Sequence, residues 1–471
     1  MKARGPMTRI MGAIPANGPF PPHRGAVPVR TSFPRPPHAG SREPAMAGWL
    51  IDRMIVLLLL LAVIATFTLS SAMLTHWKIH YVTAGGGFYE KLHPATYLTF
   101  LAFGLLLLRN ADPVGEIDRM LSGSKLILVY LACWSLLLVQ MFVLTRPFTV
   151  IIDTFLLPVV LCLAIWQLSP TQRKPLIWAT HLTILLNVCL GYYEYFSGHR
   201  LIPLTLGDVL VVGEWRSSAL LGHPLTASGL VGGYILALVL RPALCPLAML
   251  RIALIAFCLG SLMAFGGRTA LITVLLVLGF VAAKAVWLIL RGKQVSLPTV
   301  IATLCLLFIA AAGIFAAFDL GIFDKMLLRF SSDKGSALAR FATFDLLSHF
   351  DWQELVMGPN PTRVNALQAQ LGLNYGIENF WISCVVQFGL IHTILLTIGL
   401  ICLFVEILKR ANPAAWAIVL LILVIAASSV SFSSKNIQLA QFITLITLLL
   451  PRETTAPALR AAAGKPIRAY C

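Results

Sequence analysis

Two arginines and one glutamate of this chain lie at the edges of apolar runs. Arg216 precedes two serines, Arg268 follows two glycines, and Glu378 stands at the start of an apolar run. Guanidinium groups stay charged and bind phosphate oxygens in pairs, and glycine lets a backbone approach a ligand closely. A partly buried carboxylate can act as a general base. These residue types would suit a site that holds the pyrophosphate of a lipid-linked substrate at a membrane surface.

Four further polar residues are candidates for the same site. His223 precedes a proline in an apolar stretch, Asn379 follows Glu378, and Arg340 and His349 lie in an aromatic-rich segment. On a helix through that segment, Arg340 and His349 could face a substrate. Apolar residues there recur every three positions, which is typical of a helix lying on a membrane surface: Leu338, Phe341, Phe344, Leu347 and Phe350.

Each of these residues also has a plainer interpretation. Arg216 and Arg268 could contact lipid headgroups through snorkelling side chains. Glu378 could be a helix N-terminal carboxylate that the helix dipole favours. His223 could be a structural histidine, and His349 could lie on a solvated face. Two arginines close to glycine, serine and proline favour the phosphate interpretation over the headgroup one.

The elements that must position these residues are membrane helices. The 471 residues are 58% hydrophobic and 12% charged, whereas soluble domains are about 25% charged. A spanning helix needs roughly 20 apolar residues. The sequence therefore predicts an all-α integral membrane protein. Its twelve apolar segments are 48–74, 95–108, 124–145, 148–168, 175–196, 218–240, 246–265, 269–290, 298–318, 379–408, 414–431 and 436–450.

The basic residues predict how these segments are oriented. Cytoplasmic loops concentrate lysine and arginine, and 22 of the 36 basic residues lie on one side if the first segment starts inside. We therefore expect both termini in the cytoplasm and the polar segment 319–378 outside. Because the basic residues are scattered at helix ends, the net charge of +17 does not indicate nucleic-acid binding. Asp153 is expected near the outer end of the fourth segment, paired with Arg146.

The chain divides by composition into five parts. Residues 1–47 hold ten of the 27 prolines and are predicted to be a disordered basic tail rather than a signal peptide. Met46 lies just before the first apolar segment and is an alternative start. The nine cysteines show no metal-ligand spacing, so neither a zinc site nor a disulfide framework is indicated. The expected parts are the tail (1–47), transmembrane helices 1–9 (48–318), the large outer loop (319–378), transmembrane helices 10–12 (379–450) and a cytoplasmic tail (451–471).

Residues 200–408 resemble the superfamily of O-antigen ligases and Wzy-type polysaccharide polymerases, and within it the VpsF family of exopolysaccharide biosynthesis proteins. The resemblance rests on Arg-Ser-Ser-Ala-Leu-Leu-Gly-His-Pro at 216–224, Gly-Gly-Arg-Thr at 266–269, the large loop with Arg340, and Glu-Asn-Phe-Trp from 378. Many relatives carry His-Asn near the end of the loop, where this chain has Glu378-Asn379. The base role of Glu378, or else of His349, is therefore an inference for this chain.

The resemblance implies a metal-independent, inverting glycosyltransferase of the bacterial inner membrane that needs no cofactor. Its substrate would be a glycan linked to undecaprenyl pyrophosphate, held by Arg216 and Arg268 with Arg340, and contacted by His223 and Asn379. The favoured function is polymerisation of repeat units at the periplasmic face, where a chain-length regulator is a further partner to expect. The alternatives are a ligase that moves finished glycan to an acceptor, and a polysaccharide transporter or flippase. Few charges lie inside the apolar segments, which argues against transport.

Overall fold

A computed structural model gives the fold of the chain. It describes residues 44–83, 85–109, 112–203, 205–206, 209–210, 216–292, 319, 336–373, 376–429, 432 and 434–452. The chain divides into two units, residues 1–45 and residues 46–471, and the candidate membrane spans all belong to the second.

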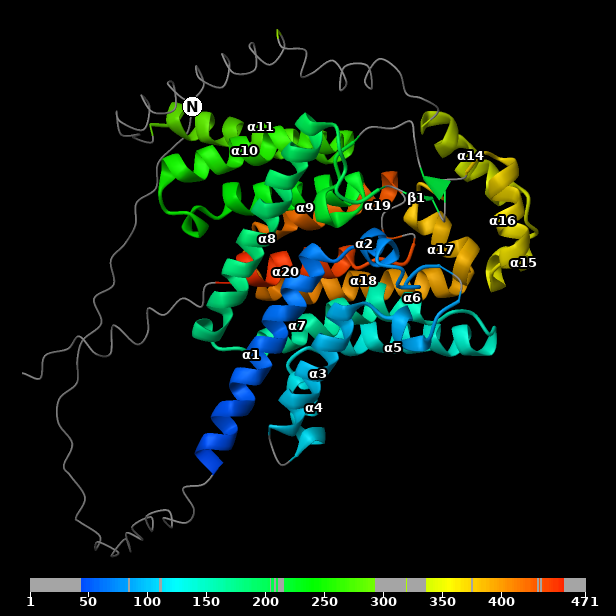
Figure 1. Ribbon diagram of the computed structural model, residues 1–471, viewed down its shortest axis with the longest axis horizontal. Coiled ribbons are helices and arrows are strands. Elements are labelled where there is room, and N and C mark those ends of the chain that lie inside the picture. The colour runs from blue at the N-terminus through cyan, green and yellow to red at the C-terminus, as the bar shows by residue number, and fades with distance from the viewer. Residues whose placement is uncertain are drawn as a thin grey trace, which may run out of the picture. The chain divides into compact units, whose positions relative to one another are not determined.

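This unit is built of helices (Figure 1). The first group comprises α1 (Pro44–Thr68), α2 (Ser71–His76), η1 (Phe88–Lys91), α3 (Pro94–Leu108), α4 (Pro113–Ser122), α5 (Lys125–Val143), α6 (Thr149–Ile151), the π-helical turn η2 (Ile152–Leu156), α7 (Leu157–Gln167) and α8 (Pro170–Ser197). The second comprises η3 (Ala219–Leu221), α9 (Pro224–Leu240), η4 (Pro242–Leu244), α10 (Ala248–Phe265), α11 (Arg268–Leu290), α14 (Ser336–Ser348), α15 (Trp352–Met357), α16 (Pro361–Gln370), α17 (Phe380–Phe388), α18 (Leu390–Arg410), α19 (Ala415–Ser428) and α20 (Gln438–Leu449). Strands β1 (Thr205–Leu206) and β2 (Val209–Leu210) form a small antiparallel hairpin.

Seven described helices are long and apolar enough to cross a membrane, or eight if α3 and α4 form one bent span. The chain is thus an all-α membrane protein, as predicted. Three apolar helices are shorter, namely α9, α19 and α20. Eleven of the twelve predicted segments coincide with these long, bent or short helices. The segment 298–318 lies outside the described residues, so the number of twelve spans stays a prediction.

The structure differs from the sequence prediction at the segment 379–408, which is two helices rather than one. The chain breaks at Gly389, whose φ of +84° is left-handed and suits glycine alone. A Cβ there would lie 2.6 Å from the Val356 carbonyl oxygen. The apolar run hid this break, because glycine within such a run can equally belong to a continuous membrane helix.

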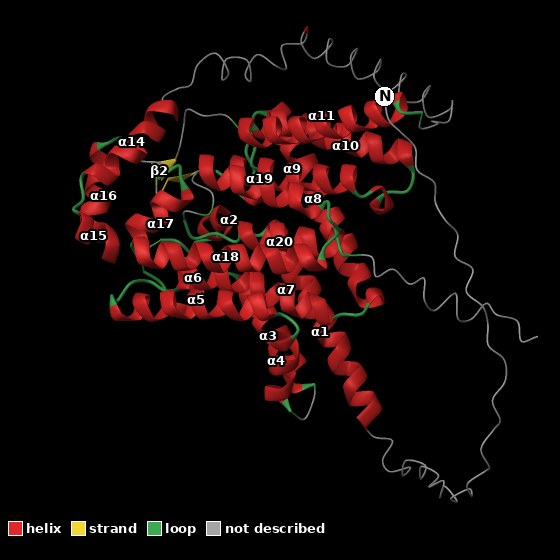
Figure 2. Cartoon of the chain, turned by 180° about the vertical axis from the view of Figure 1, so that it is seen from behind, coloured by secondary structure: helices red, strands yellow, loops and turns green. Residues whose placement is uncertain are grey.

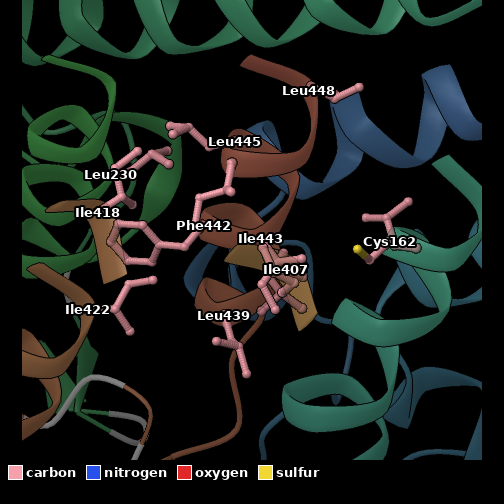
Figure 3. Close-up of a cluster of buried hydrophobic side chains, with 14 of the residues drawn as sticks. Cys162, Leu230, Ile407, Ile418, Ile422, Leu439, Phe442, Ile443, Leu445 and Leu448 are labelled. Carbon is pink, nitrogen blue, oxygen red and sulfur yellow. The ribbon is translucent and has the colours of Figure 1, made fainter. Parts of the chain in front are cut away.

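The core surrounds α20, in which every residue from Gln438 to Leu449 is buried. This helix packs against α7, α8 and α9 (Figure 1). The Phe442 ring lies beside Leu230 and Ile418 (Figure 3). Gly233 of α9 makes room for it, because a Cβ there would lie 3.2 Å from the ring. A helix of 12 residues is only about 18 Å long, which is shorter than the hydrocarbon core of a bilayer. Its complete burial therefore comes from the helices packed around it.

Polar contacts between connecting segments fall into two sets. One set joins Arg109 to Asp52 and Arg410 to the Gly123–Ser124 turn. The other joins Lys435 to Tyr81 and the Gln140 amide to the carbonyl group of Phe388. The positive-charge count assigns these two sets to opposite sides of the membrane. Which set faces the cytoplasm stays a prediction.

Three helices, α14, α15 and α16, lie within the predicted large outer loop and pack beside α17 (Figure 2). They share a small apolar core with α17, in which Leu346, Phe350 and Val364 meet Ile382 and Val386. The loop therefore has a folded part between 336 and 373 that rests on the membrane helices.

Candidate functional site

The segment that begins with Arg216 is held in place by a buried glutamate. Glu194, near the end of α8, is fully buried. Its carboxylate accepts hydrogen bonds from the backbone N–H groups of Leu201 (2.8 Å), Ser218 (2.7 Å) and Ala219 (2.9 Å). Three such donors replace the water that a buried carboxylate loses. The position of the segment is therefore determined by these backbone contacts.

Asn187 and Gly222 fix the far end of this segment. The Asn187 side chain donates to the Phe67 carbonyl group (3.0 Å) and accepts from the Leu220 N–H (3.1 Å). Gly222 has a φ of +70°, and a Cβ there would lie 2.5 Å from the Ser70 hydroxyl oxygen. The Arg216–Gly222 segment is thereby packed against the end of α1, the start of α2 and α8.

His223, a predicted substrate contact, caps a helix. Its Nδ1 accepts a hydrogen bond from the Leu225 N–H at 3.2 Å, at the start of α9. Pro224 follows as the first helical residue, a position that suits proline because no N–H is needed there. This structural role is the plainer interpretation of His223.

The structure places the two predicted arginine elements side by side. The Ser217 N–H donates to the Ala264 carbonyl group at 3.2 Å, next to the turn that precedes Arg268. Gly266 ends α10 with a φ of +66°. Gly267 packs so closely on α9 that a Cβ would collide with the Ser228 hydroxyl oxygen. The close backbone approach predicted for these glycines therefore serves helix packing, and it sets Arg268 at the first turn of α11.

Two buried serine hydroxyls lie in the same place. Ser217 and Ser218 are fully buried, and their Oγ atoms have no hydrogen-bond partner among the described residues. Hydroxyl groups without partners are rare in protein interiors and need an explanation. A third arginine lies beside them, because Arg200 Nε donates to the Arg216 carbonyl group at 2.9 Å. The sequence marks Arg200 only as an outer basic residue, since nothing in its sequence neighbours indicates this contact.

Glu378 and Asn379 lie where the loop enters the helix bundle. Asn379 caps α17, because its Oδ1 accepts from the Ile382 N–H at 3.1 Å. Phe380 follows, and its ring centroid lies 6.3 Å from that of Phe155 in η2. Glu378 is half-buried at this entry point. Glu378 thus lies two residues before the contact of Phe380 with η2, within the α6–α7 helix.

That part of α6–α7 carries a buried ion pair that the sequence did not predict. Asp153 is fully buried and lies 3.8 Å from the Lys435 ammonium group. Its carboxylate also accepts from the Thr96 hydroxyl (2.6 Å) and the His93 N–H (3.2 Å). The predicted pairing of Asp153 with Arg146 is wrong. Lys435 is 282 residues away in sequence, and only the tertiary fold brings it there.

Burial lowers the pKa values of both Lys435 and His93. Lys435 Nζ donates to the Tyr81 and Lys91 carbonyl groups and lies 4.1 Å from the centroid of the Tyr81 ring. Burial lowers its pKa to about 8, although the Asp153 carboxylate opposes this shift. Burial also lowers the pKa of His93 to about 4. The His93 Nδ1 accepts from the Ala95 N–H, so its Nε2 donates to the Leu69 carbonyl group.

Arg146 instead holds the folded loop to the membrane helices. Its guanidinium group donates to the carbonyl groups of Gln387 and Pro359, the latter at 3.1 Å. Gln140 on α5 adds a bond of 2.7 Å to the Phe388 carbonyl group. Both side chains meet the break at Gly389, where α15, α17 and α18 converge. This joint fixes the end of α17 that is opposite to Glu378.

His349, the other predicted base, lies on the exposed surface of the loop. Its Nδ1 is 2.9 Å from the Asp345 carbonyl oxygen, and its own carbonyl group accepts from Arg363. The predicted apolar stripe is divided: Leu338, Phe341 and Phe344 are exposed, whereas Phe350 is buried in the loop's own core. The side chain of Arg340 lies outside the described residues.

Comparisons with known proteins give no relative. No family model matches the chain, and neither a curated protein nor a solved structure matches it. In the described part of the chain, no group of three or more histidine, cysteine, aspartate or glutamate side chains could hold a metal ion.

Proposed function

We propose that this protein is a membrane glycosyltransferase that polymerises glycan repeat units carried on a lipid pyrophosphate. The observation that carries this proposal is the contact between Ser217 and Ala264. It brings the segment that begins with Arg216 against the end of α10, just before the turn that leads to Arg268. Two buried serine hydroxyls in that segment have no partners among the described residues. Guanidinium and hydroxyl donors are the groups that bind phosphate oxygens.

In the proposed reaction, the sugar hydroxyl of an incoming lipid-linked repeat attacks the anomeric carbon of the growing chain. The new glycosidic C–O bond forms as the C–O bond to the pyrophosphate breaks, with inversion. Glu378 takes the hydroxyl proton, and the pyrophosphate leaves with the electron pair. Arg216 and Arg268 offset the charge that develops on it. Fixed donors of this kind contribute on the order of 3 kcal/mol each to transition-state stabilisation.

Burial favours Glu378 over His349 as the base. Glu378 is half-buried where α17 meets the helix bundle, and partial burial is what tunes a carboxylate for proton transfer. His349 is exposed, and its Nδ1 already contacts a backbone carbonyl group. Arg340 keeps its proposed role as a third pyrophosphate ligand by resemblance alone.

The test is polymer length in a host that lacks its own copy of the gene. We expect Arg216→Gln and Arg268→Gln to leave single-repeat products at normal membrane levels of the protein. Lys78→Gln is the matched control, because it removes an exposed charge from the same predicted side. Full-length polymer from both arginine variants would refute the proposal. Accumulation of long lipid-linked polymer would instead identify a ligase. Loss of exported glycan with no shortening of the polymer would identify a transporter.

A further inference from the structure

A cavity of about 190 Å³ lies at the opposite end of the helices from the proposed site. It is formed where α7, α18 and α20 end (Figure 1). Three arginines line it, and most of the remaining wall is apolar or formed by an indole ring; the lining includes Arg173, Arg410, Arg452, Trp166, Ile407 and Leu450. The positive-charge count places all three arginines on the cytoplasmic side.

The chain ends that surround this cavity are bonded to one another. The Asn412 N–H donates to the Leu450 carbonyl group at 2.8 Å, and the Arg452 N–H donates to the Arg410 carbonyl group at 3.0 Å. Ala411 and Pro451 form a short bridge between the two segments. The cavity is therefore a fixed feature of the fold at the ends of α18 and α20.

Each guanidinium group is held in place by part of its donors. Arg173 donates to the Leu168 and Trp166 carbonyl groups, both at 2.9 Å. Arg410 donates to the Glu406 carboxylate (3.0 Å) and the Ser124 hydroxyl (2.6 Å), with its guanidinium carbon 4.3 Å from the centroid of the Trp166 ring.

The arginines are not saturated by these bonds. Arg452 Nη1 donates to the Lys409 carbonyl group, whereas its Nη2 donates to no described residue. The same holds for Nη1 of Arg173 and Nη1 of Arg410. Each of these nitrogens carries two N–H donors. Glu406 is the carboxylate that pairs with Arg410 there, so the cationic groups outnumber it.

We propose that this cavity binds a phosphate group. Phosphate presents several strong acceptor oxygens, which matches three arginines that line one cavity and are each held by part of their donors. Pre-ordered donors lose little conformational entropy on binding. The ligand chemistry could come from the headgroup of an anionic phospholipid or from free phosphate. This proposal does not depend on the proposed glycosyltransferase activity.

The test is thermal unfolding of the full-length protein in nanodiscs. A ligand that binds the folded state alone raises the unfolding temperature with its concentration. We compare phosphatidylcholine nanodiscs with and without phosphatidylglycerol, and then phosphatidylcholine nanodiscs with inorganic phosphate. The variants are the double substitution Arg173→Gln with Arg452→Gln, and Arg452→Gln alone. Arg291→Gln is the control, since Arg291 stacks over Trp287 at 3.7 Å on the same predicted side but does not line the cavity.

We expect the wild type and Arg291→Gln to be stabilised equally, and the double variant to bind at least tenfold more weakly. Stabilisation by phosphatidylglycerol alone identifies the ligand as a lipid headgroup. Stabilisation by inorganic phosphate identifies it as a soluble anion. If the double variant does not fold, Arg452→Gln, whose side chain is exposed, still measures the loss. An unchanged shift in the folded variants, or no shift in the wild type with either ligand, would overturn the proposal.

Discussion

The buried pair of Asp153 and Lys435 predicts a large and non-additive effect of mutation. The Asp153 carboxylate is fully buried and the Lys435 side chain is 9% exposed. At their separation of 3.8 Å, an effective dielectric constant of about 20 gives an attraction of about 4 kcal/mol. Removing one partner leaves the other charge buried and uncompensated, a change that costs about 3–5 kcal/mol.

We therefore expect Asp153→Asn to lower the free energy of unfolding by about 3–5 kcal/mol. Asparagine keeps the volume and one acceptor oxygen for the Thr96 hydroxyl, so the loss reports mainly on charge. Lys435→Met should cost a similar amount, because it also leaves the Tyr81 and Lys91 carbonyl groups without their shared donor. The double variant should be less destabilised than the sum of the two single variants by about 3 kcal/mol.

The assay is reversible unfolding in mixed micelles of detergent and sodium dodecyl sulfate, followed by tryptophan fluorescence. Wild type, both single variants and the double variant complete a thermodynamic cycle. Single losses below about 1 kcal/mol that simply add in the double variant would refute this prediction. That result would mean that water reaches the pair and screens it.

Three further predictions concern single positions. Gly389→Ala should cost on the order of 2 kcal/mol or more, because φ is +84° and the Cβ meets backbone; Gly104→Ala, with open space around it, should be neutral or stabilising in the same unfolding assay. Arg146→Gln should raise hydrogen exchange across residues 336–373, and unchanged exchange would show that the apolar core alone holds the loop. Since the folded state lowers the pKa of His93 from 6.5 to about 4, the unfolded state binds the proton more readily. Stability should therefore fall by about 3 kcal/mol between pH 6.5 and 4, and His93→Asn should flatten this dependence of the unfolding temperature.

The apolar runs predicted the helices because the backbone of a membrane segment must satisfy its own hydrogen bonds. The same runs concealed the break at Gly389 and the burial of the short helix α20. Both depend on neighbours: the break on the Val356 carbonyl group, and the burial on α7, α8 and α9. Periodicity along the chain carries no information about such partners.

The candidate site divides in the same way. Arg216, Arg268 and Glu378 could be singled out from the sequence, because their residue types and their glycine and serine neighbours suit a phosphate site at a membrane surface. Glu194 and Asn187, which hold the segment after Arg216, could not be, since they look like ordinary polar residues of a helix. The same is true of Asp153 and Lys435.

The sequence by itself determined that this is a helical membrane protein with basic groups at the ends of its helices, because composition and charge act locally. The tertiary structure alone decided which of those ends meet. It set Ser217 against Ala264, Lys435 against Asp153, and Arg410 over Trp166. Packing joins segments that lie tens to hundreds of residues apart, and only the shape of the folded chain determines which buried charge finds which partner.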